Sequence, residues 1–176
     1  MHLFTQALIL IILVACSNSI SAEDYYNRGV KHADKNEFEL AIADYNKAIE
    51  LEPNYSNAYL NRGVAYGNMG DLNRALPDFN KAIELSPNDP FPYYNRALTY
   101  ENMGESEQAI FDYSKAIELD PNNAEDVLSR ALQNRALLYE ALGRTSDAIQ
   151  DLEELLKIST DAELRRLIEK RLQELK

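Results

Sequence analysis

The tripeptide Asn61-Arg62-Gly63 decides the fold, because it recurs along the chain at a constant spacing. Asn27-Arg28-Gly29 precedes it and Asn95-Arg96-Ala97 follows it, each thirty-four positions away. A fourth copy, Asn134-Arg135-Ala136, comes after an interval that is longer by five positions. Self-similarity at this period indicates a repeat protein, in which each unit is one small structural motif stacked on the next.

Further positions keep the same period, and their spacing within each copy is helical. In the second copy Tyr59, Gly63 and Tyr66 stand at i, i+4 and i+7, so they share one face of a helix. The same spacing of small and aromatic residues recurs from Ala75 onward and predicts a second helix. The periodic residues of the second helices and of the segments that follow them are Ala41, Ala75, Ala109, Tyr45, Phe79, Tyr113, Ala48, Ala82, Ala116, Pro53, Pro87 and Pro121.

Turn residues separate the two predicted helices of each copy. Asn36, Gly70, Gly104 and Gly143 lie near the centre of these turns, and Asn and Gly tolerate the left-handed conformation that ends a helix. Pro53 and its counterparts cannot continue a helix, so they end the second helix of each copy.

With several matching positions in each of four copies, the sequence resembles the tetratricopeptide repeat (TPR) family. The resemblance implies an all-α fold, a right-handed α-solenoid of antiparallel helix pairs. It also implies a concave groove, lined by the first helices, that holds a peptide or a helix. We expect the four repeats at residues 22–55, 56–89, 90–123 and 129–162.

Three features depart from a regular array. Residues 124–128 are expected to extend the first helix of the fourth repeat. Pro77 falls inside a predicted helix, where it would cost about 3 kcal/mol and kink the axis, or less within the first turn. Residues 161–176 predict a last amphipathic helix that caps the stack with a polar outer face, beginning with a capping box at Thr160 and Glu163.

Charged residues also repeat in phase. Each periodic arginine is followed at a constant interval by an aspartate, as Arg62 is by Asp78 and Arg96 by Asp112. We expect these residues to pair within or between repeats. Exposed ion pairs contribute only about 0–1 kcal/mol each, so their role would be to set the stacking geometry more than to add stability.

The composition argues against several classes of function. The chain of 176 residues has 18 Lys and Arg against 29 Asp and Glu, a net charge of −11, whereas nucleic acids and anionic lipids attract basic surfaces. Cys16 is the single cysteine, and His32 stands in a position that Tyr66 and Tyr100 hold in other copies, which favours a packed aromatic substitute. We find no catalytic constellation, and we predict a non-enzymatic protein without cofactor or metal.

The segment 1–22 contains no Lys, Arg, Asp or Glu and includes the apolar run 7–15. The run is too short for a membrane span, which needs roughly 20 residues, and is typical of a signal peptide. Cleavage after Ala22 is one possibility. The other is cleavage before Cys16, because Leu13-Val14-Ala15-Cys16 resembles a bacterial lipobox, in which the cysteine is lipidated. We favour the second, since the lone cysteine falls where the apolar run stops.

The resemblance to TPR proteins also assigns the groove. It predicts an apolar stripe flanked by amides, which suits the backbone of an extended peptide, with Tyr94 and Leu98 as anchors beside Asn61 and Asn95. The alternative is that these asparagines bind only neighbouring helices. The assigned groove residues are Tyr26, Asn27, Val30, Leu60, Asn61, Val64, Asn68, Tyr94, Asn95, Leu98, Asn102 and Asn134.

One known type of groove is excluded by the same positions. TPRs that capture the C-terminal carboxylate of cytosolic heat-shock chaperones need lysines at positions two or five of particular repeats. A free carboxylate would find no counter-charge here. The residues at those positions are Glu23, Tyr26, Asn57, Leu60, Phe91 and Tyr94.

These observations predict a non-enzymatic adaptor of the bacterial cell envelope that binds a protein or peptide segment. The favoured location is the periplasmic face of the outer membrane, held only by lipid on Cys16. The alternative is a soluble periplasmic or secreted effector that binds a host protein. A third, an envelope enzyme acting on peptidoglycan or sugars, is disfavoured because no catalytic set is found. A homodimer through the groove or the end helix remains open.

Overall fold

The computed structural model describes residues 20–119 and 127–176, and within these ranges it consists of helices without strands. None of the described helices is both long and apolar enough to cross a bilayer. Cys16 and the apolar run before it lie outside the described residues, as do residues 124–126 of the predicted extension. The helices are α2 (Ala22–Ala33), α3 (Phe38–Leu51), α4 (Ser56–Asn68), α5 (Leu72–Leu85), α6 (Pro90–Asn102), α7 (Ser106–Leu119), α8 (Val127–Ala141), α9 (Thr145–Ile158) and α10 (Ala162–Leu175).

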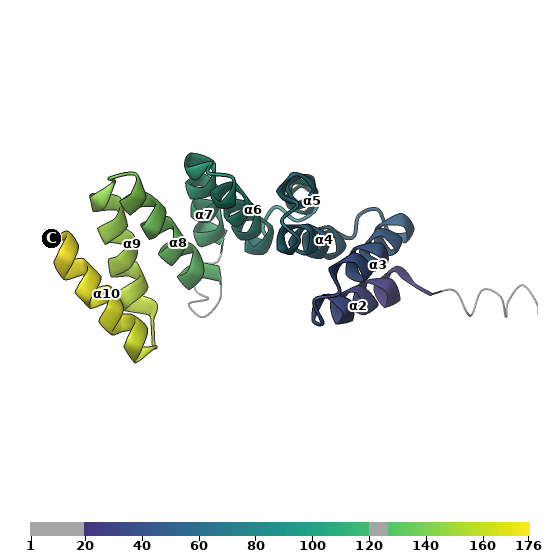
Figure 1. Ribbon diagram of the computed structural model, residues 1–176, viewed down its shortest axis with the longest axis horizontal. Coiled ribbons are helices and arrows are strands. Elements are labelled where there is room, and N and C mark those ends of the chain that lie inside the picture. Colours follow the sequence, from purple (N-terminus) through teal and green to yellow (C-terminus); the bar gives the residue numbers. More distant parts are fainter. Residues whose placement is uncertain (1–19, 120–126) are drawn as a thin grey trace, which may run out of the picture.

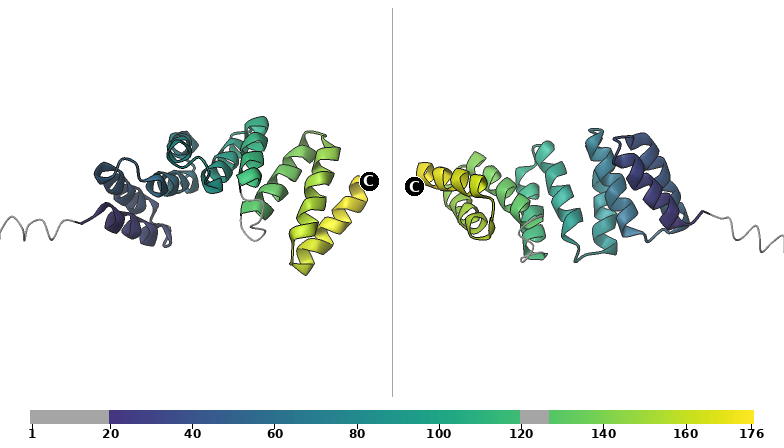
Figure 2. Two further views of the ribbon diagram at one scale, coloured as in Figure 1. Left: turned by 180° about the vertical axis from the view of Figure 1, so that it is seen from behind. Right: turned by 90° about the horizontal axis from the view of Figure 1, so that it is seen from below.

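The helices form antiparallel pairs that stack along one axis as an α-solenoid, and the pairs follow an arch from α2 to α10 (Figures 1 and 2). Each first helix contacts the first helix of the next repeat, so α4 touches both α2 and α6, and α6 touches α8. Consecutive second helices, such as α3 and α5, make no such contact within the described chain. The first helices therefore lie on the inner, concave side of the curve.

The core of each repeat is built from small residues facing one large ring. Ala41 and Ala48 are completely buried on either side of Tyr45, which is 1% exposed. Helix α4 approaches α5 so closely at Gly63 that an added Cβ would lie 2.7 Å from Cε1 of Phe79. This close packing of rings against small residues explains why the sequence repeats Gly or Ala opposite an aromatic residue.

The turns between paired helices adopt the predicted left-handed conformation. The φ angles are 61° at Asn36, 78° at Gly70 and Gly104, and 71° at Gly143. At each position the backbone reverses direction with one residue in a region that glycine enters without steric cost.

The C-terminal helix α10 packs on the last repeat through Ile168 and Leu172, which are buried against residues of α8 and α9. Its predicted start is wrong by one residue. Asp161, not Thr160, is the N-cap, and its Oδ1 accepts hydrogen bonds from the amides of Glu163 at 2.8 Å and Leu164 at 2.9 Å. A carboxylate satisfies two free amides there and also opposes the positive end of the helix dipole.

The predicted pairing of arginine with aspartate is confirmed in all four repeats. In the third repeat Nε of Arg96 donates to Oδ2 of Asp112 at 2.6 Å, and Nη2 donates to Oδ1 at 2.8 Å. Asp112 is only 1% exposed, so the expectation that these pairs are exposed is wrong, and a charge this deep is tolerated only when it is paired. The pairs are Arg28–Asp44, Arg62–Asp78, Arg96–Asp112 and Arg135–Asp151.

The same arginines also join consecutive repeats. Nη1 of Arg62 donates to Oδ1 of Asn46 on α3 at 2.5 Å, and Nη1 of Arg96 donates to Oδ1 of Asn80 on α5 at 2.6 Å. In the fourth repeat Arg135 donates to the hydroxyl of Ser114 on α7 at 2.7 Å. Each of these three guanidinium groups therefore binds one helix of its own repeat and one of the repeat before.

Replacing Arg96 by alanine is expected to lower the free energy of unfolding by roughly 3–5 kcal/mol, because Asp112 would stay buried without its partner. Arg28→Ala should cost less, since the Arg28 side chain is 49% exposed and water can take its place beside Asp44. Urea unfolding followed by circular dichroism measures both changes.

The matched control combines Arg96→Met with Asp112→Leu, which removes both charges and keeps apolar volume at the site. We expect this double variant to recover most of the lost stability, as apolar replacements of buried ion pairs often do. Equal losses for Arg96→Ala and Arg28→Ala, or no recovery in the double variant, would contradict a buried, stability-bearing pair.

Pro77 lies beyond the first turn of α5, and its side chain is exposed to solvent. Proline has no amide hydrogen to donate to the carbonyl of Asn73, and its ring crowds that carbonyl. The equivalent position of α3 is held by Ala43, which is exposed. The second repeat therefore carries a local defect that the first repeat lacks.

Pro77→Ala should raise the free energy of unfolding by about 1–3 kcal/mol, because it restores one helical hydrogen bond and removes the clash. Ala43→Pro is the reciprocal control and should lower stability by about 3 kcal/mol. Both are measured by urea denaturation. A Pro77→Ala variant no more stable than the wild type would show that α5 accommodates the proline without cost.

Candidate functional site

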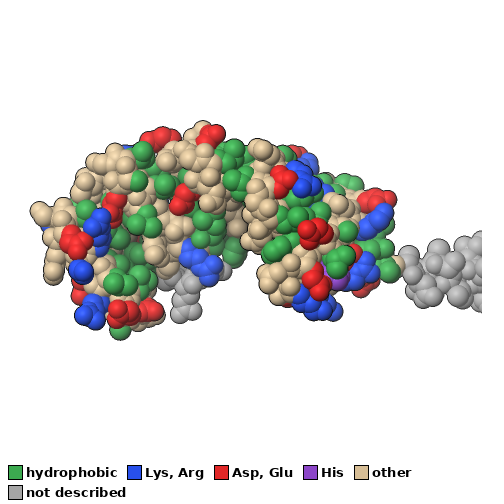
Figure 3. All heavy atoms as spheres, in the orientation of Figure 1, with side chains coloured by type: hydrophobic (Ala, Val, Ile, Leu, Met, Phe, Trp, Pro, Cys, Tyr) green, Lys and Arg blue, Asp and Glu red, His purple; other side chains and the backbone are tan. Residues whose placement is uncertain are grey.

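The predicted groove residues all lie on the first helices, at the inner side of the arch. They come from α2, α4, α6 and α8, and each is exposed or half-buried, so their side chains can be reached from solvent. On the face drawn in Figure 3, basic side chains are scattered among acidic and apolar ones. The groove residues themselves are amides, apolar side chains and tyrosine rings.

A cavity of about 140 Å³ lies at the centre of the array, between the second and third repeats. Five of the predicted groove residues meet there: Val64, Asn68, Asn95, Leu98 and Asn102. The remaining wall comes from Gly67, Leu72, Phe79 and Thr99, which sequence reasoning did not assign.

Gly67 makes room for this cavity. An added Cβ at Gly67 would meet no atom within 4 Å, and the equivalent positions of the third and fourth repeats hold Glu101 and Glu140. The sequence therefore indicates the cavity, because it has a glycine at a position where the later repeats have a large side chain. It marks a place where a ligand can approach the helix closely.

The asparagine ladder is partly engaged in the fold. Nδ2 of Asn61 donates to the hydroxyl of Tyr26 at 3.0 Å, and Nδ2 of Asn134 donates to the hydroxyl of Tyr113 at 3.1 Å. Asn95 turns back on its own helix and donates to the carbonyl of Phe91 at 2.9 Å. Each amide has a second N–H and a carbonyl oxygen as well, so these bonds orient the asparagines without exhausting them.

Aromatic rings form the N-terminal end of the groove. The ring centroid of Tyr26 lies 4.9 Å from that of Tyr55 and 6.0 Å from that of Tyr45. Burial raises the pKa of Tyr26, although its hydrogen bond from Asn61 acts the other way. Burial also raises the pKa of Tyr45 to about 12. Both hydroxyls are therefore neutral at physiological pH. Tyr45 is buried, so the rings that this end of the groove offers are those of Tyr26 and Tyr55.

The C-terminal end of the groove is apolar, and α10 contributes to it, which the sequence analysis missed. A cavity of about 220 Å³ opens between α8 and α10. Leu137 and Leu167 line it, and each is 56% exposed. Nε of Arg171 lies 3.0 Å from Oε2 of Glu140 at its rim, where the two side chains form an ion pair. The sequence did hint at this, because α10 comes directly after α9, where the first helix of a fifth repeat would stand.

The carboxylates near the groove are held by other groups. The hydroxyl of Tyr113 donates to Oε2 of Glu101 at 2.7 Å, and Glu140 is paired with Arg171. The positions where a carboxylate-binding TPR needs lysine hold none. A lysine clamp for a C-terminal carboxylate is therefore missing from these positions.

His32 is half-buried and lies beside carboxylates. Its Nδ1 lies 2.6 Å from Oε2 of Glu37, and this hydrogen bond lowers the pKa of that carboxyl group. Within residues 20–119 and 127–176 no cluster of histidine, cysteine and carboxylate side chains is arranged to hold a metal ion.

Comparison with protein-family models matches nearly all of the repeat region. A model described as TPR repeat matches residues 29–70, and models described as tetratricopeptide repeat match residues 56–89, 90–123 and 129–161. No curated protein matches the chain.

Solved structures share the fold. A tetratricopeptide repeat protein from Parabacteroides merdae is 25% identical, with a TM-score of 0.75 over 89% of this chain and 60% of that one. The first TPR domain of Spaghetti (RPAP3), bound to the HSP90 peptide SRMEEVD, is 25% identical, with a TM-score of 0.65 over 72% of this chain and 96% of that one. A MamA variant is 22% identical, with a TM-score of 0.72 over 89% of this chain and 88% of that one. Together with the in-phase residues and the stacked helix pairs, these matches show that the chain belongs to the tetratricopeptide repeat family.

Proposed function

We propose that the protein is a non-enzymatic adaptor of the bacterial cell envelope that recruits a partner protein by binding a segment of it in the concave groove. The observation that carries this proposal is the central cavity, where the amides of Asn68, Asn95 and Asn102 meet the apolar side chains of Val64 and Leu98. Amides pair with the main chain of an extended segment, while apolar walls take its side chains.

The groove favours an uncharged or apolar segment. Tyrosine rings stand at its N-terminal end and exposed leucines at its C-terminal end. The Spaghetti domain binds the acidic peptide SRMEEVD, but this chain lacks the lysines that such a carboxylate would need. A partner of this chain would therefore be recognised through its backbone and apolar side chains.

The start of α2 supports processing before Cys16 over cleavage after Ala22. The hydroxyl of Ser21 accepts a hydrogen bond from the amide of Asp24 at 3.0 Å, and the amide of Ser21 donates to Oδ2 of Asp24, also at 3.0 Å. Cleavage after Ala22 would remove this capping box and put a positive amino group at the helix N-terminus. Such a loss costs about 1 kcal/mol, whereas a mature chain that begins at Cys16 keeps the cap.

Filling the central cavity should abolish partner binding without harming the fold. Gly67→Leu places an apolar side chain in the cavity and favours the helix, so stability should stay equal or rise by up to about 1 kcal/mol. The pair Asn68→Ala and Asn102→Ala should weaken binding by roughly 1–3 kcal/mol per amide that met a buried peptide group. Asn61→Ala is a poorer test, because it also removes the bond to Tyr26.

The measurement is pull-down from envelope extract with immobilised protein, together with thermal melting of each variant. Asn73→Leu is the matched control, because Asn73 is exposed on α5 outside the groove of the same repeat. Recovery of the same partner by Gly67→Leu and by the wild type would mean that the central cavity is not the binding site.

Cys16→Ser should release the protein from the membrane fraction or leave its precursor unprocessed, because the serine cannot accept the lipid that we propose as the anchor. Intact mass and N-terminal sequencing of the wild-type protein give the direct readout. A wild-type protein that fractionates as soluble, with Glu23 as its first residue, would favour the soluble periplasmic or secreted effector instead.

A further inference from the structure

Two of the four repeats cover one tyrosine of the first helix with an arginine. The guanidinium carbon of Arg74 lies 4.5 Å from the ring centroid of Tyr66, and that of Arg144 lies 4.4 Å from the ring centroid of Tyr139. Tyr100 holds the same position in the third repeat. Among the described residues no guanidinium stands over its ring.

The sequence explains this difference. Gln108 holds the position in the third repeat that Arg74 holds in the second, and Glu105 holds the position of Asp71. Asp71 accepts a hydrogen bond from Nε of Arg74 at 2.5 Å, whereas Glu105 accepts one from the side-chain amide of Gln108, also at 2.5 Å. The third repeat thus keeps the carboxylate but has a shorter, neutral side chain in place of the cation.

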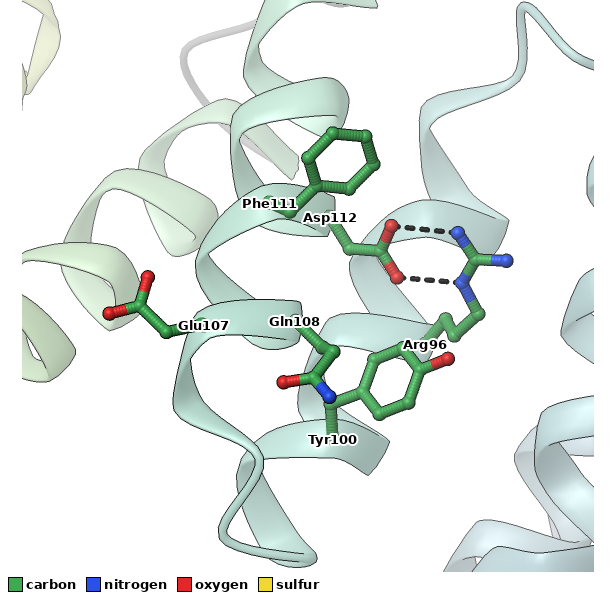
Figure 4. Close-up of a pocket in the computed structure, with 6 residues that line it drawn as sticks. All are labelled: Arg96, Tyr100, Glu107, Gln108, Phe111 and Asp112. Carbon is green, nitrogen blue, oxygen red and sulfur yellow. Dashed lines mark hydrogen bonds and ion pairs between the residues drawn. The ribbon is translucent and has the colours of Figure 1, made fainter.

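A cavity of about 330 Å³ lies at this position (Figure 4). Phe111 extends from α7 beside it and is 60% exposed, more than the other large apolar side chains of the described chain. Glu107 is 70% exposed and turns toward the next repeat, where Arg144 lies 3.6 Å away. The cavity is lined by Arg96, Tyr100, Glu107, Gln108, Phe111 and Asp112.

We propose that this cavity is a docking site for an arginine side chain of a partner protein. The guanidinium would lie over Tyr100, as the protein's own arginines lie over Tyr66 and Tyr139, and its methylene groups would pack on Phe111. Glu105, which accepts the hydrogen bond from Gln108 at the cavity, supplies negative charge, and the net charge of −11 attracts a basic partner. Arginine fits better than lysine, because its planar guanidinium stacks on a ring.

The positive charge of Arg96 does not exclude a second arginine. Both Nε and Nη2 of Arg96 are bound to Asp112, which neutralises the charge next to the cavity. The fourth repeat already holds two arginines on one ring, since Arg135 lies 5.7 Å and Arg144 lies 4.4 Å from the centroid of Tyr139.

This site is separate from the concave groove. On α6, Arg96 and Tyr100 face away from Asn95 and Leu98, because successive residues of a helix are turned by about 100°. The second wall comes from α7, whose exposed side lies on the outer surface of the arch. Arginine binding at this cavity can therefore be tested separately from segment binding in the concave groove.

The test is a titration of the full chain, labelled at its aromatic rings, with N-acetyl-arginine amide under NMR observation. We expect saturable shifts at Tyr100 and Phe111, and much smaller shifts with N-acetyl-citrulline amide, which has nearly the same shape without the charge. Phe111→Ala should weaken binding roughly threefold to tenfold, because it removes the apolar wall.

Gln108→Arg is the decisive variant, because it supplies the covering arginine from within, as Arg74 does in the second repeat. It should weaken binding of the probe roughly tenfold or more without lowering the melting temperature. Leu40→Arg is the matched control, since Leu40 holds the equivalent position of the first repeat and is 53% exposed. It adds the same charge to the surface and should leave the shifts of Tyr100 unchanged.

Three outcomes would overturn the proposal. Equal shifts with citrulline or with N-acetyl-leucine amide would mean a general apolar surface. Unchanged binding in Gln108→Arg would mean that the arginine lies elsewhere. Self-association in sedimentation that disappears with Gln108→Arg would assign the cavity to a second copy of this chain instead of a different protein.

Discussion

The ion pair between an arginine of each first helix and a buried aspartate of the second is the interaction on which the rest of the structure depends. Its two parallel hydrogen bonds restrict the distance and the rotation of the paired helices, because a bidentate guanidinium–carboxylate pair is planar and directional. The third nitrogen then reaches the preceding repeat, at Asn46, Asn80 or Ser114. One arginine side chain thus holds the two helices of its own repeat together and also joins that repeat to the one before it.

The fourth repeat shows how strong this constraint is. Five extra residues enter the chain before it, so Arg135 and Ser114 are 21 residues apart, whereas Arg96 and Asn80 are separated by 16. The cross-repeat bond is nevertheless formed, and Arg135 still holds Asp151. Helix α8 includes residues 127 and 128 of the expected extension. Breaking the cross-repeat bond would leave polar groups unpaired in a partly buried interface.

Much of this architecture could be predicted from the sequence, because each repeated position meets the same neighbours. The period predicted the helix pairs, the left-handed turns at Asn36 and Gly104, and the partner of every periodic arginine. The partners of the asparagines could not be predicted, since they depend on whether the neighbouring repeat offers a hydroxyl. Asn61 finds Tyr26, but the corresponding neighbour of Asn95 is Leu60, and Asn95 turns back to a carbonyl of its own helix. The role of α10 in the groove was missed because this helix has no second copy to compare with.

The places where the repeats differ are also the places where the surface is hollow. Gly67 replaces a larger side chain and opens the central cavity, and Gln108 replaces an arginine and leaves Tyr100 without its cover. A regular array must pack each repeat against the next in the same way, so its invariant positions are occupied by the stacking itself. A position that differs between repeats can open a hollow beside them, where periodic residues such as Asn95 and Tyr100 become accessible to a partner. In this protein the repeated geometry of the arginine ladder makes such departures tolerable, because one altered surface residue does not disturb the helices that carry it.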